Sequence, residues 1–280
     1  MIMETTSKIE SINRKDIKLL SSEDFDSLYR AYTYSFFPLY IFKINGKMYH
    51  IKQNKIHNLI NELIGQYVTE FFGGKKLNSK LYIDDKFSNY LITENFIKNS
   101  HHYTNLHSNI FPKINFDKDE ILSIKDLDNF DYIKNNKYGE IVETNLKDLK
   151  QFKLDLKIMI VSDFIRKQSD RKFRNFMFEY KDNRVKLMPL YDYEYSFDLY
   201  KPKLINSFEL TLKNESIVSY IRNDDTFQEL FYRAMNLNLN TILERLQDEY
   251  PVSMNSLEMS KYISIVLVRQ DDIKRYNLLK

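Results

Sequence analysis

The sequence predicts an α+β fold with two lobes, in which a strand-rich part precedes a mainly helical part. Two β-prone runs, LYIFKI and KMYHIK, flank Asn45-Gly46 near the start of the chain. Apolar residues recur at helical spacing over residues 56–71, and again from about residue 205 to the C-terminal end. No internal repeat or low-complexity linker occurs. This order of elements predicts a cleft between the two lobes.

The composition is that of a folded protein and excludes several kinds of chemistry. The chain has 280 residues, of which 43% are hydrophobic and 29% are charged, enough to bury a full core. Because cysteine is absent, disulfides, thiolate catalysis and Cys-ligated zinc are excluded, which fits a reducing compartment. The five glycines show neither Walker nor Rossmann spacing, so a glycine-rich phosphate loop of either type is excluded.

The charge pattern and the apolar runs bear on partners and location. The net charge of +3 comes from interspersed acids and bases, so no specific nucleic-acid partner is expected. No run of about 18 apolar residues occurs, so no membrane span is expected. The first 15 residues lack the apolar core of a signal peptide. We therefore expect a cytoplasmic protein, or one exported without a classical signal peptide.

The Asn45-Gly46 pair predicts a β-hairpin, because a type I′ turn needs positive φ at both central residues. Side chains alternate along the second strand, so Lys52 shares one face with two neighbours, and two other residues lie opposite. These two faces are Met48, His50 and Lys52 against Tyr49 and Ile51.

The remaining elements follow from periodicity and turn residues. Residues 16–33 are expected to be helical or mixed, and residues 99–145 to form loops and short helices. The other predicted elements are a helix over 56–71 ending at Gly73-Gly74, strands at KLYID and NYLITENFI, a helix over 147–167, strands at FMFEY and RVKLMPL, and helical pieces at 215–235, 238–249 and 256–279.

The stretch from Asp170 to Asn175, with Asp192 after the next predicted hairpin, carries the most chemical information. Phosphoryl transfer needs a carboxylate that orients the attacking hydroxyl and accepts its proton, and oxygen ligands that hold Mg²⁺ against the phosphates. An Asp-x4-Asn loop supplies a base and an amide ligand, and the hairpin returns a second Asp to the same cleft. Asp-x4-Asn alone is common by chance, and the flanking helix and strands make it specific.

A second cluster lies upstream. Lys52 ends the second strand of the Asn-Gly hairpin, and Glu62 lies early on the helix that follows. In kinases a strand lysine contacts the α- and β-phosphates and is held by a helix glutamate. Glu70, later on the same helix, is the second candidate partner for Lys52, although a solvent-facing position suits it better.

In this order, the motifs resemble those of the HipA-like Ser/Thr protein kinases, which are distantly similar to phosphatidylinositol 3- and 4-kinases. The matching pieces are YHIK, NELIGQYVTEFFG, YLITENF, SDRKFRNF and LMPLYD, within residues 36–200. The chain looks more like the compact, cell-translocating members, because it lacks the additional N-terminal subdomain of the longer HipA toxins. It departs from the usual pattern at Lys172, where a histidine is typical, and at Asp192-Tyr193-Glu194, which replaces Asp-Phe-Gly.

The resemblance implies a bilobal protein-kinase-like fold, with an N-lobe over residues 1–97 and a C-lobe over residues 98–280. It implies ATP and Mg²⁺ as cofactors and phosphorylation of Ser/Thr hydroxyls, including the protein's own. The implied roles are Asp170 as the catalytic base, Asn175 and Asp192 as metal ligands, and Lys52, Glu62 and the hinge residues Glu94, Asn95 and Phe96 as the ATP site. An antitoxin or a host protein is the kind of partner it suggests, and the protein substrate stays unassigned.

Two alternatives stay open. The same fold could phosphorylate a phosphoinositide or another small alcohol, and the Asp170-Arg171 pair resembles the lipid-kinase loop. The interspersed charges argue mildly against a membrane-facing patch. A pseudokinase that binds nucleotide and acts as a scaffold is the other alternative. The presence of Lys52, Asp170, Asn175 and Asp192 together argues against it.

Overall fold

The computed structural model describes a central sheet and a group of helices. The described residues are 18–19, 39–44, 47–83, 89–94, 111, 124, 126–134, 141–143, 147–168, 171, 178–181, 184–190, 193, 196–197, 212–250 and 252–280.

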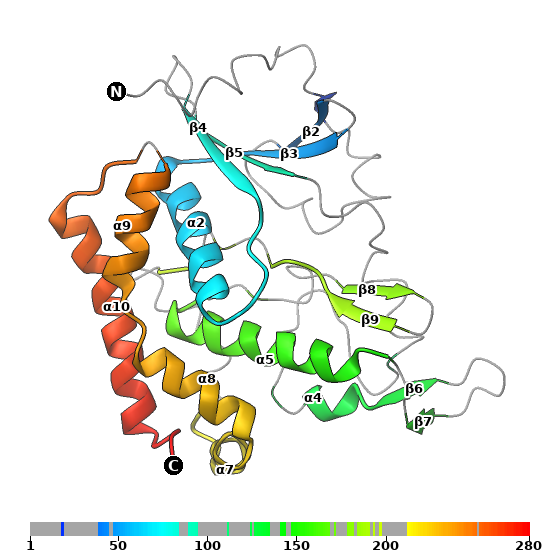
Figure 1. The fold of residues 1–280 in the computed structure, drawn as a ribbon. Helices are drawn as coiled ribbons and strands as arrows, with labels where there is room; N and C mark the ends of the chain where they lie inside the picture. Colours follow the sequence, from blue (N-terminus) through cyan, green and yellow to red (C-terminus); the bar gives the residue numbers. More distant parts are fainter. Residues whose placement is uncertain are drawn as a thin grey trace.

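A five-stranded antiparallel sheet forms the strand-rich part, in the order β1-β2-β3-β5-β4 (Figure 1). Its strands are β1 (Lys18–Leu19), β2 (Leu39–Ile44), β3 (Lys47–Gln53), β4 (Ser79–Ile83) and β5 (Asn89–Glu94). The predicted hairpin is confirmed, because β2 pairs with β3 and Ile44 lies opposite Lys47. Asn45 and Gly46 themselves, and the side chains of residues 48–51, whose facing was predicted, lie outside the described part.

Helices make up most of the remainder, on one side of the sheet in Figure 1. They are α2 (Ile56–Phe71), α4 (Asp126–Asn129), α5 (Leu149–Ile165), α7 (Glu215–Asn223), α8 (Asp225–Met235), α9 (Leu239–Glu249) and α10 (Ser256–Arg275). Two short hairpins, β6 (Tyr132–Lys134) with β7 (Ile141–Glu143) and β8 (Phe178–Lys181) with β9 (Arg184–Leu187), complete the described elements. The mixed helix and sheet composition agrees with the predicted class, and the lobe boundary at residue 97 stays a prediction.

The described elements differ from the sequence-based ones in three places. The predicted helix over 215–235 is two helices, because Asp224 ends α7 and caps α8 by accepting a hydrogen bond from Phe227 N (3.0 Å). Asp224 also binds Lys157 of α5 (2.5 Å), which fixes the break against the core. The β6–β7 hairpin lies where only loops and short helices were expected, and β1 lies in the segment expected to be helical or mixed.

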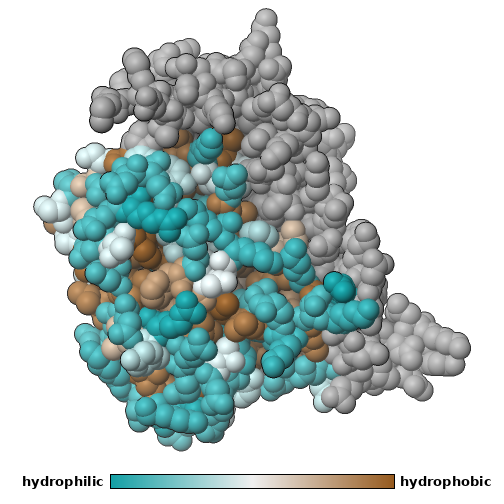
Figure 2. Space-filling model, viewed as in Figure 1, coloured by the Kyte–Doolittle hydropathy of each residue, from teal (hydrophilic) through white to brown (hydrophobic). Residues whose placement is uncertain are grey.

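The core lies where α2, α5, α8 and α9 meet. Each helix contributes fully buried apolar side chains to one cluster, including Leu63, Phe164, Phe231 and Leu243. A buried side chain of this size contributes about 1.5–3 kcal/mol relative to an exposed one. Figure 2 shows a mainly hydrophilic described surface with apolar residues near the middle of this face. Among the described helices, none is long and apolar enough to cross a bilayer.

Helix α2 is joined to the C-terminal helices along much of its length. Arg233 of α8 donates to the carbonyl oxygens of Phe71 (2.6 Å) and Phe72 (3.3 Å) at its C-terminal end. Tyr262 of α10 donates to Asn61 (3.0 Å) near its N-terminal end. Between them, the Tyr67 hydroxyl donates to Glu249 of α9. The helix that carries Glu62 is therefore fixed to the helical part of the molecule as well as to the sheet.

Candidate active site

Lys52 and Glu62 form the ion pair that the sequence predicted. Lys52 lies in β3 opposite Leu91 of β5, and its ammonium Nζ lies 3.5 Å from Glu62 Oε2. The lysine side chain is 19% exposed and the glutamate side chain 4%, so the lysine keeps an open side while its partner is enclosed. A carboxylate beside the ammonium favours its charged form, which a desolvated lysine without a partner would tend to lose.

Glu70, the second candidate partner, takes a different role. It binds Arg245 of α9 (2.8 Å), and both side chains are largely exposed. An exposed pair of this kind contributes about 0–1 kcal/mol. The solvent-facing position that the sequence favoured for Glu70 is confirmed.

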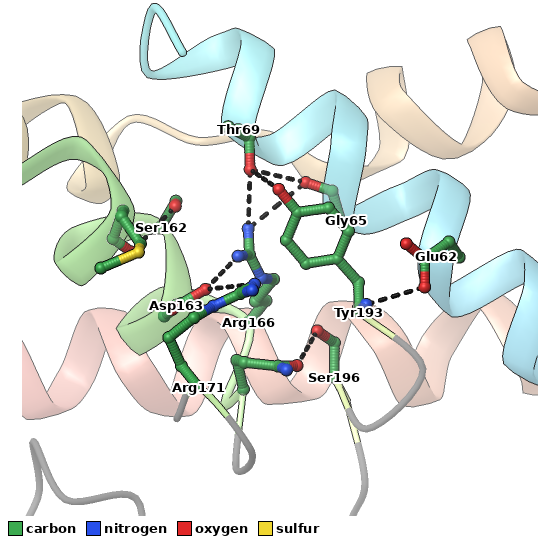
Figure 3. A network of polar contacts seen from close by, with 11 residues as sticks. Glu62, Gly65, Thr69, Ser162, Asp163, Arg166, Arg171, Tyr193 and Ser196 are labelled. Atoms are coloured by element: carbon green, nitrogen blue, oxygen red, sulfur yellow. Dashed lines mark hydrogen bonds and ion pairs between the residues drawn. The ribbon is translucent and has the colours of Figure 1, made fainter. Parts of the chain in front are cut away.

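The Glu62 carboxylate has a second partner from a distant part of the chain. The backbone N–H of Tyr193 donates to Glu62 Oε2 at 2.7 Å (Figure 3). Tyr193 directly follows Asp192, the predicted metal ligand. One carboxylate oxygen therefore joins the strand lysine to the segment that carries Asp192, which are the two regions that a bound nucleotide would have to bridge.

Several of the predicted site residues lie outside the described part of the chain. These are Asp170, Asn175, Asp192, Asn95 and Phe96. Glu94 is the last residue of β5, with its backbone paired to Tyr49. The roles assigned to all of these residues stay predictions. Two of their chain neighbours, Arg171 and Tyr193, are described, and both have buried contacts.

A buried charge cluster joins the end of α5 to the segment after Asp170. Arg171 donates to Asp163 through Nε (2.8 Å) and Nη2 (3.4 Å), and Arg166 also binds Asp163 through Nη2. The exposed fractions of Asp163, Arg166 and Arg171 are 6%, 0% and 5%. Burial lowers the pKa of the Arg166 guanidinium, and the adjacent Asp163 carboxylate opposes that shift.

The fully buried Tyr193 ring lies against this cluster and against α2 (Figure 3). The guanidinium carbons of Arg166 and Arg171 lie 4.2 Å and 5.0 Å from its centroid. Thr69 Oγ1 donates to Gly65 O (2.9 Å) and accepts from Arg166 Nη1 (3.0 Å), so its contact with the Tyr193 hydroxyl (3.0 Å) is one in which the tyrosine donates. Burial raises the pKa of the Tyr193 phenol, which keeps it a donor.

Gly65 makes this close approach possible. A Cβ atom at Gly65 would lie 2.5 Å from Tyr193 Cγ and 2.6 Å from Tyr193 Cβ. Glycine inside a helix costs about 1 kcal/mol relative to alanine, so the position gives up helix stability for the tyrosine contact.

We expect Gly65→Ala to lower the free energy of unfolding by about 1–3 kcal/mol, the usual cost of overpacking, despite the better helix propensity of alanine. Urea titration followed by circular dichroism measures this change. The control is Thr241→Ala at an exposed position of α9, which should leave stability equal or slightly higher. Equal stability of Gly65→Ala and wild type would show that the ring can move away from α2 without cost.

Part of this site could not be found from the sequence. Asp163, Arg166 and Thr69 lack a motif, and their contacts join residues up to 124 positions apart. The alternation of Tyr191, Tyr193 and Tyr195 was the one available signal, and it favours buried rings on a strand face. Tyr193 is indeed buried, although it lies beyond β9 rather than in a strand.

The comparisons with known proteins agree with this arrangement at the level of the fold. No family model matches the sequence, and no curated protein matches it either. Solved structures do match over nearly the whole chain, among them a kinase and a protein of a toxin–antitoxin system. The chain therefore has a kinase-like fold, as its resemblance to the HipA-like kinases implied.

Two of these structures are similar enough to support that conclusion. The proinflammatory kinase CtkA of Helicobacter pylori is 14% identical, with a TM-score of 0.59, and the match covers 95% of this chain and 93% of CtkA. HipA of the Shewanella oneidensis MR-1 toxin–antitoxin system is 13% identical, with a TM-score of 0.51, and the match covers 99% of this chain and 72% of HipA. At this identity the likeness defines the fold.

Proposed function

We propose that this protein is an ATP-dependent phosphotransferase that phosphorylates Ser/Thr hydroxyls of proteins, including its own. The observation that carries the proposal is the double contact of Glu62 with Lys52 Nζ (3.5 Å) and Tyr193 N (2.7 Å). A buried carboxylate that contacts both a partly exposed lysine and Tyr193, the residue after a predicted metal ligand, suits the binding of a polyphosphate. A purely structural ion pair would not need the lysine to keep an open side.

Each predicted site residue would have a definite task in the reaction. Lys52 would donate to the α- and β-phosphate oxygens, with Glu62 holding its direction. Asp170 would accept the proton of the acceptor hydroxyl while the hydroxyl oxygen forms the bond to the γ-phosphorus. The bond between the γ-phosphorus and the β–γ bridging oxygen breaks, and ADP leaves. The backbone at Glu94, Asn95 and Phe96 would receive the adenine.

The predicted metal ligands suit Mg²⁺, because the Asp192 carboxylate and the Asn175 amide supply the hard oxygen donors that this ion prefers. When bound, Mg²⁺ neutralises charge on the β- and γ-phosphates. The contact of Tyr193 N with Glu62 supports this assignment, since it keeps the residue after Asp192 within reach of the lysine that would bind the same nucleotide.

The two similar structures suggest a context. One is a proinflammatory kinase, and the other belongs to a toxin–antitoxin complex with its operator DNA. A host protein as substrate, or an antitoxin as binding partner, is therefore the kind of partner to test first.

Incubation with γ-labelled ATP and Mg²⁺ tests the proposal, with the protein alone, with generic protein acceptors, and with phosphoinositide vesicles. We expect label on protein, including the enzyme, and none when EDTA replaces Mg²⁺. Label on lipid alone would indicate a lipid kinase instead. Nucleotide binding without any transfer would indicate a pseudokinase, and absence of both binding and transfer would overturn the proposal.

A further inference from the structure

We propose that Asp163 and Arg171 are positioning residues for the predicted base Asp170 and the predicted metal ligand Asp192. They would act through a buried network that links Arg171 and Tyr193, the residues that directly follow these two aspartates. The inference rests on the proposed function, because it assigns a purpose to residues that would not touch the nucleotide. Figure 3 shows the network between α2, the end of α5 and the segment that begins at Tyr193.

Each of the two predicted acidic site residues is joined through the chain to a described residue. Arg171 directly follows Asp170, and Tyr193 directly follows Asp192. Consecutive Cα atoms lie about 3.8 Å apart, so fixing one residue restricts its neighbour to a small volume. Two residues that are packed against each other therefore limit the separation of the two acidic residues that precede them.

Arg171 and Tyr193 also contact each other directly. The Arg171 guanidinium lies 5.0 Å from the centroid of the Tyr193 ring and binds Asp163 through two nitrogens. Asp163 also binds Arg166, which lies on the same ring at 4.2 Å. The planar guanidinium can meet a carboxylate with two donors while it stacks on an aromatic ring, and lysine cannot do both.

The network contains a cluster of buried charges, formed by Asp163, Arg166 and Arg171. Among the described residues, the cluster holds the guanidinium groups of Arg166 and Arg171 and the carboxylate of Asp163, each at least nine-tenths enclosed. Replacing buried ion pairs with apolar residues of similar volume is often neutral or stabilising, so stability alone gives a weak reason for such a cluster. A requirement that Arg171 and Tyr193 keep a defined orientation and separation gives a stronger reason for the cluster.

A second connection joins the same two segments. The Ser196 hydroxyl donates to Gln168 Oε1 (2.6 Å), and Phe197 N donates to Arg166 O (2.9 Å). Lys167 and Phe197 both have positive φ, at 55° and 60°, which costs energy for residues other than glycine. The backbone is thus held in two uncommon conformations where the segment before Asp170 meets the segment after Asp192.

The main test is Arg171→Lys, which keeps the charge and loses the two-donor, stacked geometry. We expect kcat for phosphotransfer to fall about 10–100-fold with KM for ATP within about 3-fold, because a misplacement of about 1 Å at a reacting group costs about 10²-fold. Ser196→Ala removes the second connection without altering buried charge. It should lower kcat less, and its effect should not add to that of Arg171→Lys.

The matched control is Arg269→Lys, which changes another buried arginine that binds an aspartate, Asp272, at 2.9 Å in α10. Its kcat should stay within about 2-fold of wild type while its thermal stability falls comparably to that of Arg171→Lys. Equal losses of kcat in the two arginine variants, or an unchanged kcat in Arg171→Lys and Ser196→Ala, would show that the network serves stability alone.

Hydrogen exchange separates failure of this inference from failure of the proposed function, because it needs no activity. Arg171→Lys should raise exchange in peptides covering residues 168–177 and 188–197 together, and the control should leave both unchanged. If only the first peptide responds, the two segments are not coupled and the inference is wrong, whether or not the wild type transfers phosphate. If Arg171→Lys raises exchange in both peptides but the wild type transfers no phosphate, the proposed function is refuted instead.

Discussion

Asp170→Asn is expected to lower the rate of phosphotransfer by about 10²–10⁴-fold, the usual contribution of a general base. The amide keeps the size and shape of the carboxylate but cannot accept the proton of the attacking hydroxyl. Nucleotide affinity should change little, because Asp170 would act on the acceptor rather than on ATP. Single-turnover transfer of labelled phosphate, together with binding of a fluorescent ATP analogue, measures the two quantities separately.

Asp271→Asn is a suitable control, since this aspartate of α10 has a side chain that is 78% exposed. Its rate and its affinity should both match the wild type. Near-normal turnover in Asp170→Asn would falsify the assignment of the loop from Asp170 to Asn175 as the catalytic loop. The assignment of Lys52 would survive that outcome.

Lys52→Ala should lower phosphotransfer by at least about 10²-fold, in the range seen when one preorganised donor to a developing charge is removed. The lysine is the charged donor that Glu62 holds at 3.5 Å. Glu62→Gln should have a smaller effect, about 10-fold, because its amide oxygen can still accept from Tyr193 N. Steady-state kinetics with ATP as the varied substrate should show the lysine effect in both kcat and KM.

Glu70→Gln supplies the matched control for Glu62→Gln, because both residues lie on α2 and Glu70 binds the exposed Arg245 instead. Its kinetics should stay within about 2-fold of wild type. A Glu70→Gln variant as impaired as Glu62→Gln would mean that α2 matters only as a packed helix. A Lys52→Ala variant with normal transfer would place another lysine on the phosphates.

The sequence by itself determined the elements whose signals are local. The Asn45-Gly46 pair and the β-prone runs beside it predicted the β2–β3 pairing, and helical spacing predicted α2 within a residue. The pairing of Lys52 with Glu62 was expected from the kinase pattern of a strand lysine held by a helix glutamate, and the structure confirms the contact. The kinase type of fold was expected from a resemblance to the HipA-like kinases, which short motifs in a fixed order carried.

The tertiary structure alone decided how these parts meet. The break at Asp224 depends on a capping side chain that also binds α5, so the periodicity across 215–235 could not reveal it. The contact of Tyr193 N with Glu62 joins residues 131 positions apart, and neither residue type predicts it. The cluster of Asp163, Arg166 and Arg171 depends on how the end of α5 packs against α2. Local propensity acts over a few residues, whereas buried charge and close ring contacts are set by which distant surfaces the fold brings together.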